Sequence, residues 1–106
     1  MAWVLLITAG VLEIGFALAM KQSSGFQHLG PSLLFVVLAA TSTALLALAT
    51  KHLPIGTSYA IWTGIGAAGT AVAGIVLLGE LATPLRLLAI ALIVVGVVVL
   101  QVAEGR

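Results

Sequence analysis

The chain has 106 residues, 62% of them hydrophobic and 7% charged, and its formal net charge is +1. So little charge cannot cover the surface of a soluble globule, which places the sequence in the membrane class. Without cysteine, with only two separated histidines (His28 and His52) and with no basic tract, the sequence gives no reason to expect thiol chemistry, a metal site or a nucleic-acid partner.

Four apolar runs follow one another along the chain, each close to the ~20 residues that cross a bilayer core as a helix. The short segments between them are rich in Lys, Gly and Pro, as is typical of loops. We therefore predict an all-α membrane protein in which residues 1–106 form a single four-helix transmembrane domain embedded in a lipid bilayer. The predicted helices cover about residues 3–20, 33–50, 58–78 and 85–102.

The first predicted helix carries a single carboxylate, Glu13, in an otherwise apolar segment. A helix that starts near Ala2 brings Glu13 to a depth of about 16 Å, close to the middle of a bilayer core that is ~30 Å thick. An ionised carboxylate costs roughly 2.5 to 3.5 kcal/mol there, so the default interpretation is a functional group that faces the protein interior or water. The alternative is a protonated Glu that makes one interhelical hydrogen bond.

We interpret Glu13 as a site that a proton and a cation occupy in turn. Burial favours the neutral carboxyl, whereas the deprotonated form attracts a cation, so the two compete for one group. If the site opens to only one side of the membrane at a time, this competition is sufficient for antiport. The sequence has no ATP-binding motif, so we expect no cofactor and a proton gradient as the energy source.

Helical spacing predicts which residues line the site with Glu13. On the first helix, Gly10 and Phe16 lie three residues to either side of it and share its face. The second helix offers the polar run 41–43 at mid-depth, of which one residue should point inward. Ser42 is our candidate there.

The third predicted helix contributes aromatic and polar residues. Tyr59 and Trp62 are three residues apart on one face, and Thr63 lies beside them. Such aromatics either belong to the interfacial belt or contact a bound cation, and spacing does not decide between the two. Trp3, at the start of the first helix, fits the belt better.

Small residues on the last two predicted helices indicate bending and close packing. Gly64 and Gly66, one residue apart, weaken the third helix locally, so we predict a hinge there. Ala89 and Gly96 lie one heptad apart on the fourth helix, and we assign them to dimer packing because small residues let helices approach closely in lipid. The alternative is that glycine is simply common in membrane helices.

The positive charges give almost no orientation signal. Four spans place Lys51 and Arg106 on the side of the termini and Lys21 and Arg86 on the other, two against two. A weak excess such as the N-terminal amine would still fix one orientation. The sharper interpretation is that the protein inserts both ways and pairs with itself as an antiparallel homodimer, because four short helices can hardly enclose a solvated cavity alone.

Three motifs together resemble the small multidrug resistance transporters over almost the whole chain. They are "LEIGFALAMK" around Glu13, "GF" followed by "PS" at 25–26 and 31–32, and "LPIGTSYAIWTGIGA" at 53–67. The resemblance implies a four-helix subunit, an antiparallel dual-topology homodimer in the bacterial inner membrane, and proton-coupled export of cations. It assigns Glu13 as the carboxylate for proton and substrate, Ser42 and Trp62 as its hydrogen-bonding partners, Tyr59 as an aromatic gate, and Gly64 and Gly66 as the flexible point.

Within that family, "WTGIGA" at 62–67 and "GIVLLGE" at 74–80 resemble the subtype that exports guanidinium. One position departs from the subtype, because Phe16 stands where a Trp is usual and Phe has no N–H to donate. The expected substrate is guanidinium, together with substituted guanidinium-like cations. The alternatives are an exporter of quaternary ammonium and other drug cations, or one subunit of a heterodimeric pair.

Overall fold

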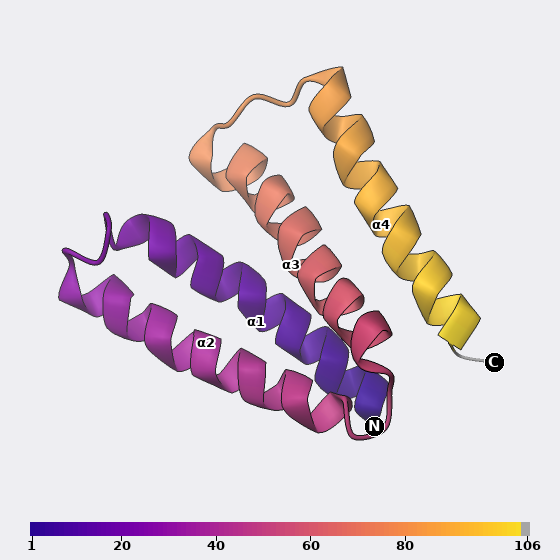
Figure 1. The fold of residues 1–106 in the computed structure, drawn as a ribbon. Coiled ribbons are helices and arrows are strands. Elements are labelled where there is room, and N and C mark those ends of the chain that lie inside the picture. The colour runs from indigo at the N-terminus through magenta and orange to yellow at the C-terminus, as the bar shows by residue number, and fades with distance from the viewer. Residues whose placement is uncertain (105–106) are drawn as a thin grey trace.

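The computed structural model describes residues 1–104 and contains four α-helices. These are α1 (Ala2–Gln22), α2 (Leu29–Ala49), α3 (Ile55–Leu78) and α4 (Pro84–Glu104), shown in Figure 1. By length and composition each is able to cross a membrane, and no strand occurs in the described part of the chain. The predicted all-α membrane fold is confirmed. Arg106, one of the four basic residues in the charge count, lies outside the described residues.

Each helix begins before the apolar run that predicts it, and the difference is largest at the start of α2. We expected a loop up to residue 32, but α2 begins at Leu29 and contains Pro31 in its first turn. Proline fits there because the first N–H groups of a helix have no partner within it. The hydroxyl of Ser32 donates to the carbonyl oxygen of His28 at 2.6 Å and fastens this turn.

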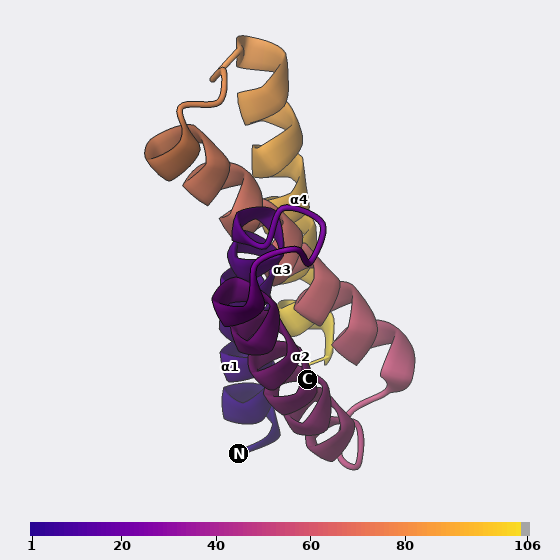
Figure 2. The same ribbon diagram turned by 90° about the vertical axis from the view of Figure 1, so that its left-hand side faces the viewer.

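The helices form a thin, open arrangement rather than a closed bundle. α1 packs against both α2 and α3, and α4 packs on α3 (Figure 1). Both termini and the loop between α2 and α3 lie low in Figure 2, whereas the loop between α3 and α4 lies at the top. The subunit measures 44 × 34 × 17 Å, so it is thin in one direction.

Glycines set the distance between α1, α3 and α4. A Cβ on Gly10 would lie 2.8 Å from the Cβ of Ile65, and one on Gly64 would lie 2.5 Å from Cγ2 of Val97. These positions therefore have room for hydrogen only, as expected where membrane helices approach closely. α3 runs unbroken through Gly64 and Gly66, so their role as a hinge stays a prediction.

The residues that we assigned to dimer packing face away from their own subunit. Ala89 is exposed, and a Cβ on Gly96 would meet nothing within 4 Å. Their role in dimerisation stays a prediction.

Candidate functional site

The side chain of Glu13 leaves α1 toward α3 and fits against Gly66. The carboxyl occupies the space that a Cβ on Gly66 would need, so only glycine at position 66 leaves room for it. The carboxylate oxygen Oε1 is buried and has no hydrogen-bond partner among residues 1–104. A buried oxygen without a donor is costly, so the carboxyl of Glu13 is the first candidate for a functional group in this subunit.

Ser42 and Trp62 form a short chain of hydrogen bonds beside the carboxyl. The indole Nε1–H of Trp62 donates to Oγ of Ser42 at 2.9 Å, and the hydroxyl of Ser42 donates to the carbonyl oxygen of Ala9 at 2.6 Å. Ser42 is fully buried. We expected both side chains to bond Glu13, and the structure corrects this, because the single N–H of Trp62 and the single O–H of Ser42 are already donated elsewhere.

The carbonyl of Ala9 explains why this chain of bonds matters for the site. In an α-helix the N–H of residue 13 donates to the carbonyl of residue 9, so Ala9 links Ser42 to the backbone of Glu13 itself. α1, α2 and α3 are thereby joined by directional bonds one turn before the carboxyl. The two interhelical bonds restrict the register of α1, α2 and α3 next to the carboxyl, and neither bond involves the carboxyl itself.

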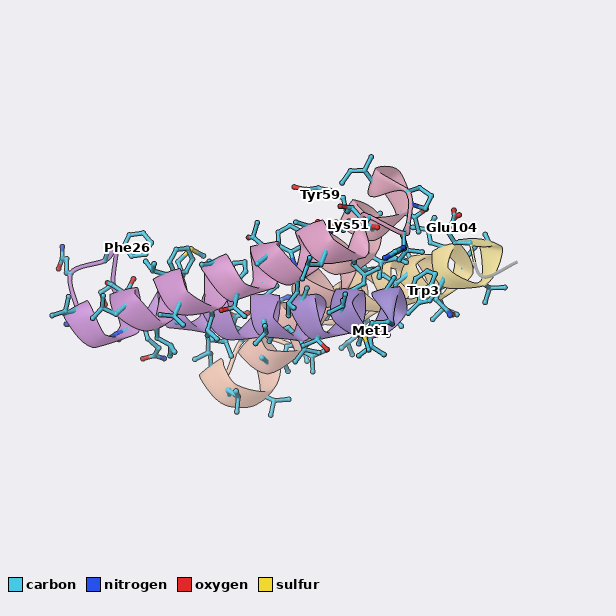
Figure 3. All side chains as sticks on the ribbon, turned by 90° about the horizontal axis from the view of Figure 1, so that it is seen from below. Met1, Trp3, Phe26, Lys51, Tyr59 and Glu104 are labelled. Carbon is cyan, nitrogen blue, oxygen red and sulfur yellow. The ribbon has the colours of Figure 1, made fainter. Side chains whose placement is uncertain are left out.

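Tyr59 and Trp62 stack along α3, with ring centroids 5.5 Å apart and planes tilted by 54°. Tyr59 is 55% exposed and lies with Trp3, Lys51 and Glu104 near one end of the molecule, opposite Phe26 (Figure 3). Trp62 is one turn deeper and bonded to Ser42. Tyr59 therefore lies nearer to this end of the molecule, and Trp62 lies nearer to the carboxyl of Glu13.

Three further predicted lining residues are not brought to the carboxyl within one subunit. The ring of Phe16 packs edge-to-face on Phe35 of α2 at 5.6 Å, Gly10 packs against Ile65, and Thr63 is exposed. Gly10 therefore has a packing role in the subunit. Phe16 lies on the α2 side of α1, whereas the carboxyl of Glu13 lies on the α3 side.

The family model of the Small Multidrug Resistance protein matches residues 1–93. The chain belongs to the small multidrug resistance family. It is 52% identical to the guanidinium exporter of Escherichia coli (strain K12) over 103 residues, which cover 97% of this chain and 98% of that protein. It is also 52% identical to the guanidinium exporter of Yersinia pestis over 104 residues, covering 98% of this chain and all of the relative.

Four apolar helices and membership of the small multidrug resistance family identify a multi-pass protein of the bacterial inner membrane. The family that we inferred from the motifs is thereby confirmed. The guanidinium exporter of Salmonella typhimurium (strain LT2) is similar to this chain as well, with 50% identity over 103 residues. All three relatives match over almost their whole length, so the comparison covers the complete helical domain.

Sequence reasoning missed two parts of this small multidrug resistance site. The first is Gly66 as the seat of the carboxyl, since we had read that residue only as a hinge. The second is the carbonyl of Ala9, which carries no signal in the sequence because every residue has a carbonyl. The small residues on α1 and α3 are the one sequence feature that indicates a close approach of these helices at Gly66.

Chemically, the site offers one carboxylate in an apolar surrounding. A carboxylate accepts hydrogen bonds and binds a proton or a cation. A guanidinium ion presents its N–H donors in a planar fork that matches the two oxygens of a carboxylate. Quaternary ammonium groups have no N–H, so they would depend on aromatic faces and shape instead.

Proposed function

We propose that this protein is a proton-coupled antiporter that exports guanidinium ions across the inner membrane. The observation that carries the proposal is the buried oxygen of Glu13, a carboxyl acceptor at mid-span without a donor among the described residues. The names of the relatives, guanidinium exporters at 50–52% identity over the whole domain, support the choice of substrate. The proton gradient supplies the energy, and no cofactor is needed.

Antiport follows from the competition for one carboxyl. Deprotonated Glu13 holds the cation, and a proton that reaches the same oxygens from the other side of the membrane displaces it. The hydrogen bonds among Trp62, Ser42 and the Ala9 carbonyl can stay intact in both stages, because none of them involves the carboxyl. They therefore keep the helices around the carboxyl in the same place. Tyr59, exposed near one end of the subunit, is in position to close the site on that side as an aromatic gate.

We propose further that the working unit is an antiparallel, dual-topology homodimer. The subunit is only 17 Å across in its shortest dimension, and a second copy in the opposite orientation would complete a larger enclosure around the site. The even distribution of the four Lys and Arg residues supports insertion in both orientations. Ala89 and Gly96 on the exposed face of α4 would pack between the copies.

The substrate is tested by measuring electrogenic currents of the purified protein on solid-supported membranes. We expect a saturable current with guanidinium at an imposed pH difference. A response to tetrapropylammonium with none to guanidinium would contradict the proposal. It would favour the second candidate, an exporter of quaternary ammonium and other drug cations, for which Phe16 in place of the subtype's Trp is the supporting observation.

The topology is tested separately, with reporters fused to the C-terminus. We expect activity from reporters that require the cytoplasm and from reporters that require the periplasm. Detection on one side only would contradict dual topology and favour a heterodimer with a homologous chain of opposite orientation.

A further inference from the structure

Thr70 lies next to the carboxyl site on α3. It follows Gly66 by four residues, so the two side-chain positions are neighbours on one helix face. This face meets α1, since Gly66 contacts Glu13 and Gly69 contacts Ile14. Because Trp62 precedes Gly66 by four residues, the carboxyl of Glu13 has Trp62 one turn to one side of it on α3 and Thr70 one turn to the other.

The hydroxyl of Thr70 has no partner among residues 1–104, although its oxygen Oγ1 is buried. Two threonines on or next to α2 bond a carbonyl of their own helix or turn: Thr41 donates to Val37 at 2.8 Å, and Thr50 donates to Ala47 at 2.7 Å. Such bonding is the ordinary solution for Thr in a helix. A buried hydroxyl that does not use it requires an explanation. Ser58 is also unpartnered, but it lies two turns before Gly66 on α3, away from the carboxyl.

A guanidinium ion held by Glu13 needs more acceptors than the carboxylate supplies. Its three nitrogens all carry N–H groups, and a bidentate carboxylate engages two of these groups. Trp62 cannot accept, because its indole nitrogen is a donor only, and the oxygen of Ser42 already receives that N–H. Thr70 offers an oxygen with free lone pairs one turn from Gly66.

We propose that Thr70 is a second hydrogen-bonding position of the cation site, which accepts an N–H of the guanidinium ion held on Glu13. This inference rests on the proposed function and adds a residue that determines specificity. Thr70 thereby favours cations with several N–H donors over cations that lack them, since its hydroxyl stays unpaired when no donor arrives.

The test compares Thr70→Val with Thr70→Ser by guanidinium currents on solid-supported membranes. Valine keeps the shape and removes the acceptor, so we expect KM for guanidinium to rise roughly tenfold, the size of one hydrogen bond to a charged group, with little change in the maximal current. Serine keeps the hydroxyl and should restore KM. Thr41→Val is the matched control, because its hydroxyl is already bonded to Val37, and it should leave KM unchanged.

Three results would overturn the inference. They are an unchanged KM in Thr70→Val, an equal defect in Thr70→Ser, and a fall of maximal current and thermal stability at constant KM, which would give Thr70 a packing role only. If Thr70→Val does not yield folded protein, Thr70→Cys, similar in size and a weaker acceptor, takes its place. Absence of a guanidinium current in the wild type would instead contradict the proposed function itself.

Discussion

α1 and α4 show how differently two membrane helices of one subunit are used. α4 is the more apolar of the two, yet none of its residues is buried. α1 contains a carboxylate and contacts two other helices, and it buries Leu6, Ala9, Gly10 and Ala19. In water the more apolar segment would be the more buried, whereas in lipid, which is as apolar as leucine, burial follows small residues and polar groups.

The polar groups of α1 to α3 and the exposed face of α4 therefore have different roles. Glycines and hydrogen bonds around Glu13 hold three helices in one register, as is required to place a single carboxyl. α4 is tied to α3 by the close approach at Gly64 and by the hydrogen bond from Thr57 to Glu104, and it leaves Gly96 free. Substitutions in the two regions should accordingly have effects of different size and kind.

The largest expected effect is at Glu13 itself. Glu13→Gln removes the only titratable side chain near the middle of α1 at similar volume, so proton-coupled exchange should be lost completely while the protein folds normally. Guanidinium flux into proteoliposomes under a pH gradient measures the exchange, and circular dichroism with gel filtration checks that the variant folds normally. Coupled transport that survives this change would remove Glu13 from the mechanism.

The next largest effect is expected at Gly66. Gly66→Ala would place a methyl group in the space of the Glu13 carboxyl and force it from its seat, at a cost of about 1–3 kcal/mol and with an increase of about tenfold or more in KM for guanidinium. Gly56→Ala is the matched control on the same helix, because a Cβ there meets nothing within 4 Å. Equal KM values in both variants would show that the close approach at Gly66 does not position the carboxyl.

A smaller effect is expected when the bond chain is cut at Ser42. Ser42→Ala leaves the N–H of Trp62 without an acceptor and should lower the free energy of unfolding by about 1–2 kcal/mol. Unfolding in mixed micelles with increasing denaturing detergent measures the change. Thr43→Ala, on the exposed side of the same helix, should alter it far less. A loss of similar size in both would indicate that the Ser42 bonds add no specific stability.

The smallest effect is expected at the end of α4. Thr57→Val removes the donor to Oε1 of Glu104, a bond of 3.0 Å, so the last turn of α4 should loosen by about 0.5–1.5 kcal/mol while transport changes little. Amide hydrogen exchange over residues 98–104 measures this. Glu80→Gln is a control at the opposite end, because its ion pair with Arg86 is exposed and should contribute close to nothing. Unaltered exchange in Thr57→Val would mean that packing alone holds α4 on α3.

The four helices and the place of Glu13 near the middle of α1 could be predicted from the sequence because both depend on position along the chain alone. Apolar length sets the number of spans, and the apolar run around Glu13 sets where that residue lies along its helix. The start of α2 was harder to place, since Gly30 and Pro31 are usual in loops and also tolerated in a first helical turn.

The partners within the site could not be predicted in the same way. Which residue of α3 meets Glu13 depends on the crossing and register of two helices, and one-dimensional patterns leave both open. Ser42 and Trp62 were placed at the site, but the sequence does not tell that they bond each other and the Ala9 carbonyl instead of the carboxylate. Helical phase and residue type alone do not distinguish these two networks.

The bond from Ser42 to the Ala9 carbonyl has a consequence for the proposed antiport cycle. Since the donors that align the three helices are all satisfied by oxygens other than those of Glu13, loading or unloading the site breaks none of them. In that proposed cycle, the bonds that align α1, α2 and α3 can therefore stay the same in the empty, protonated and cation-bound forms of the site.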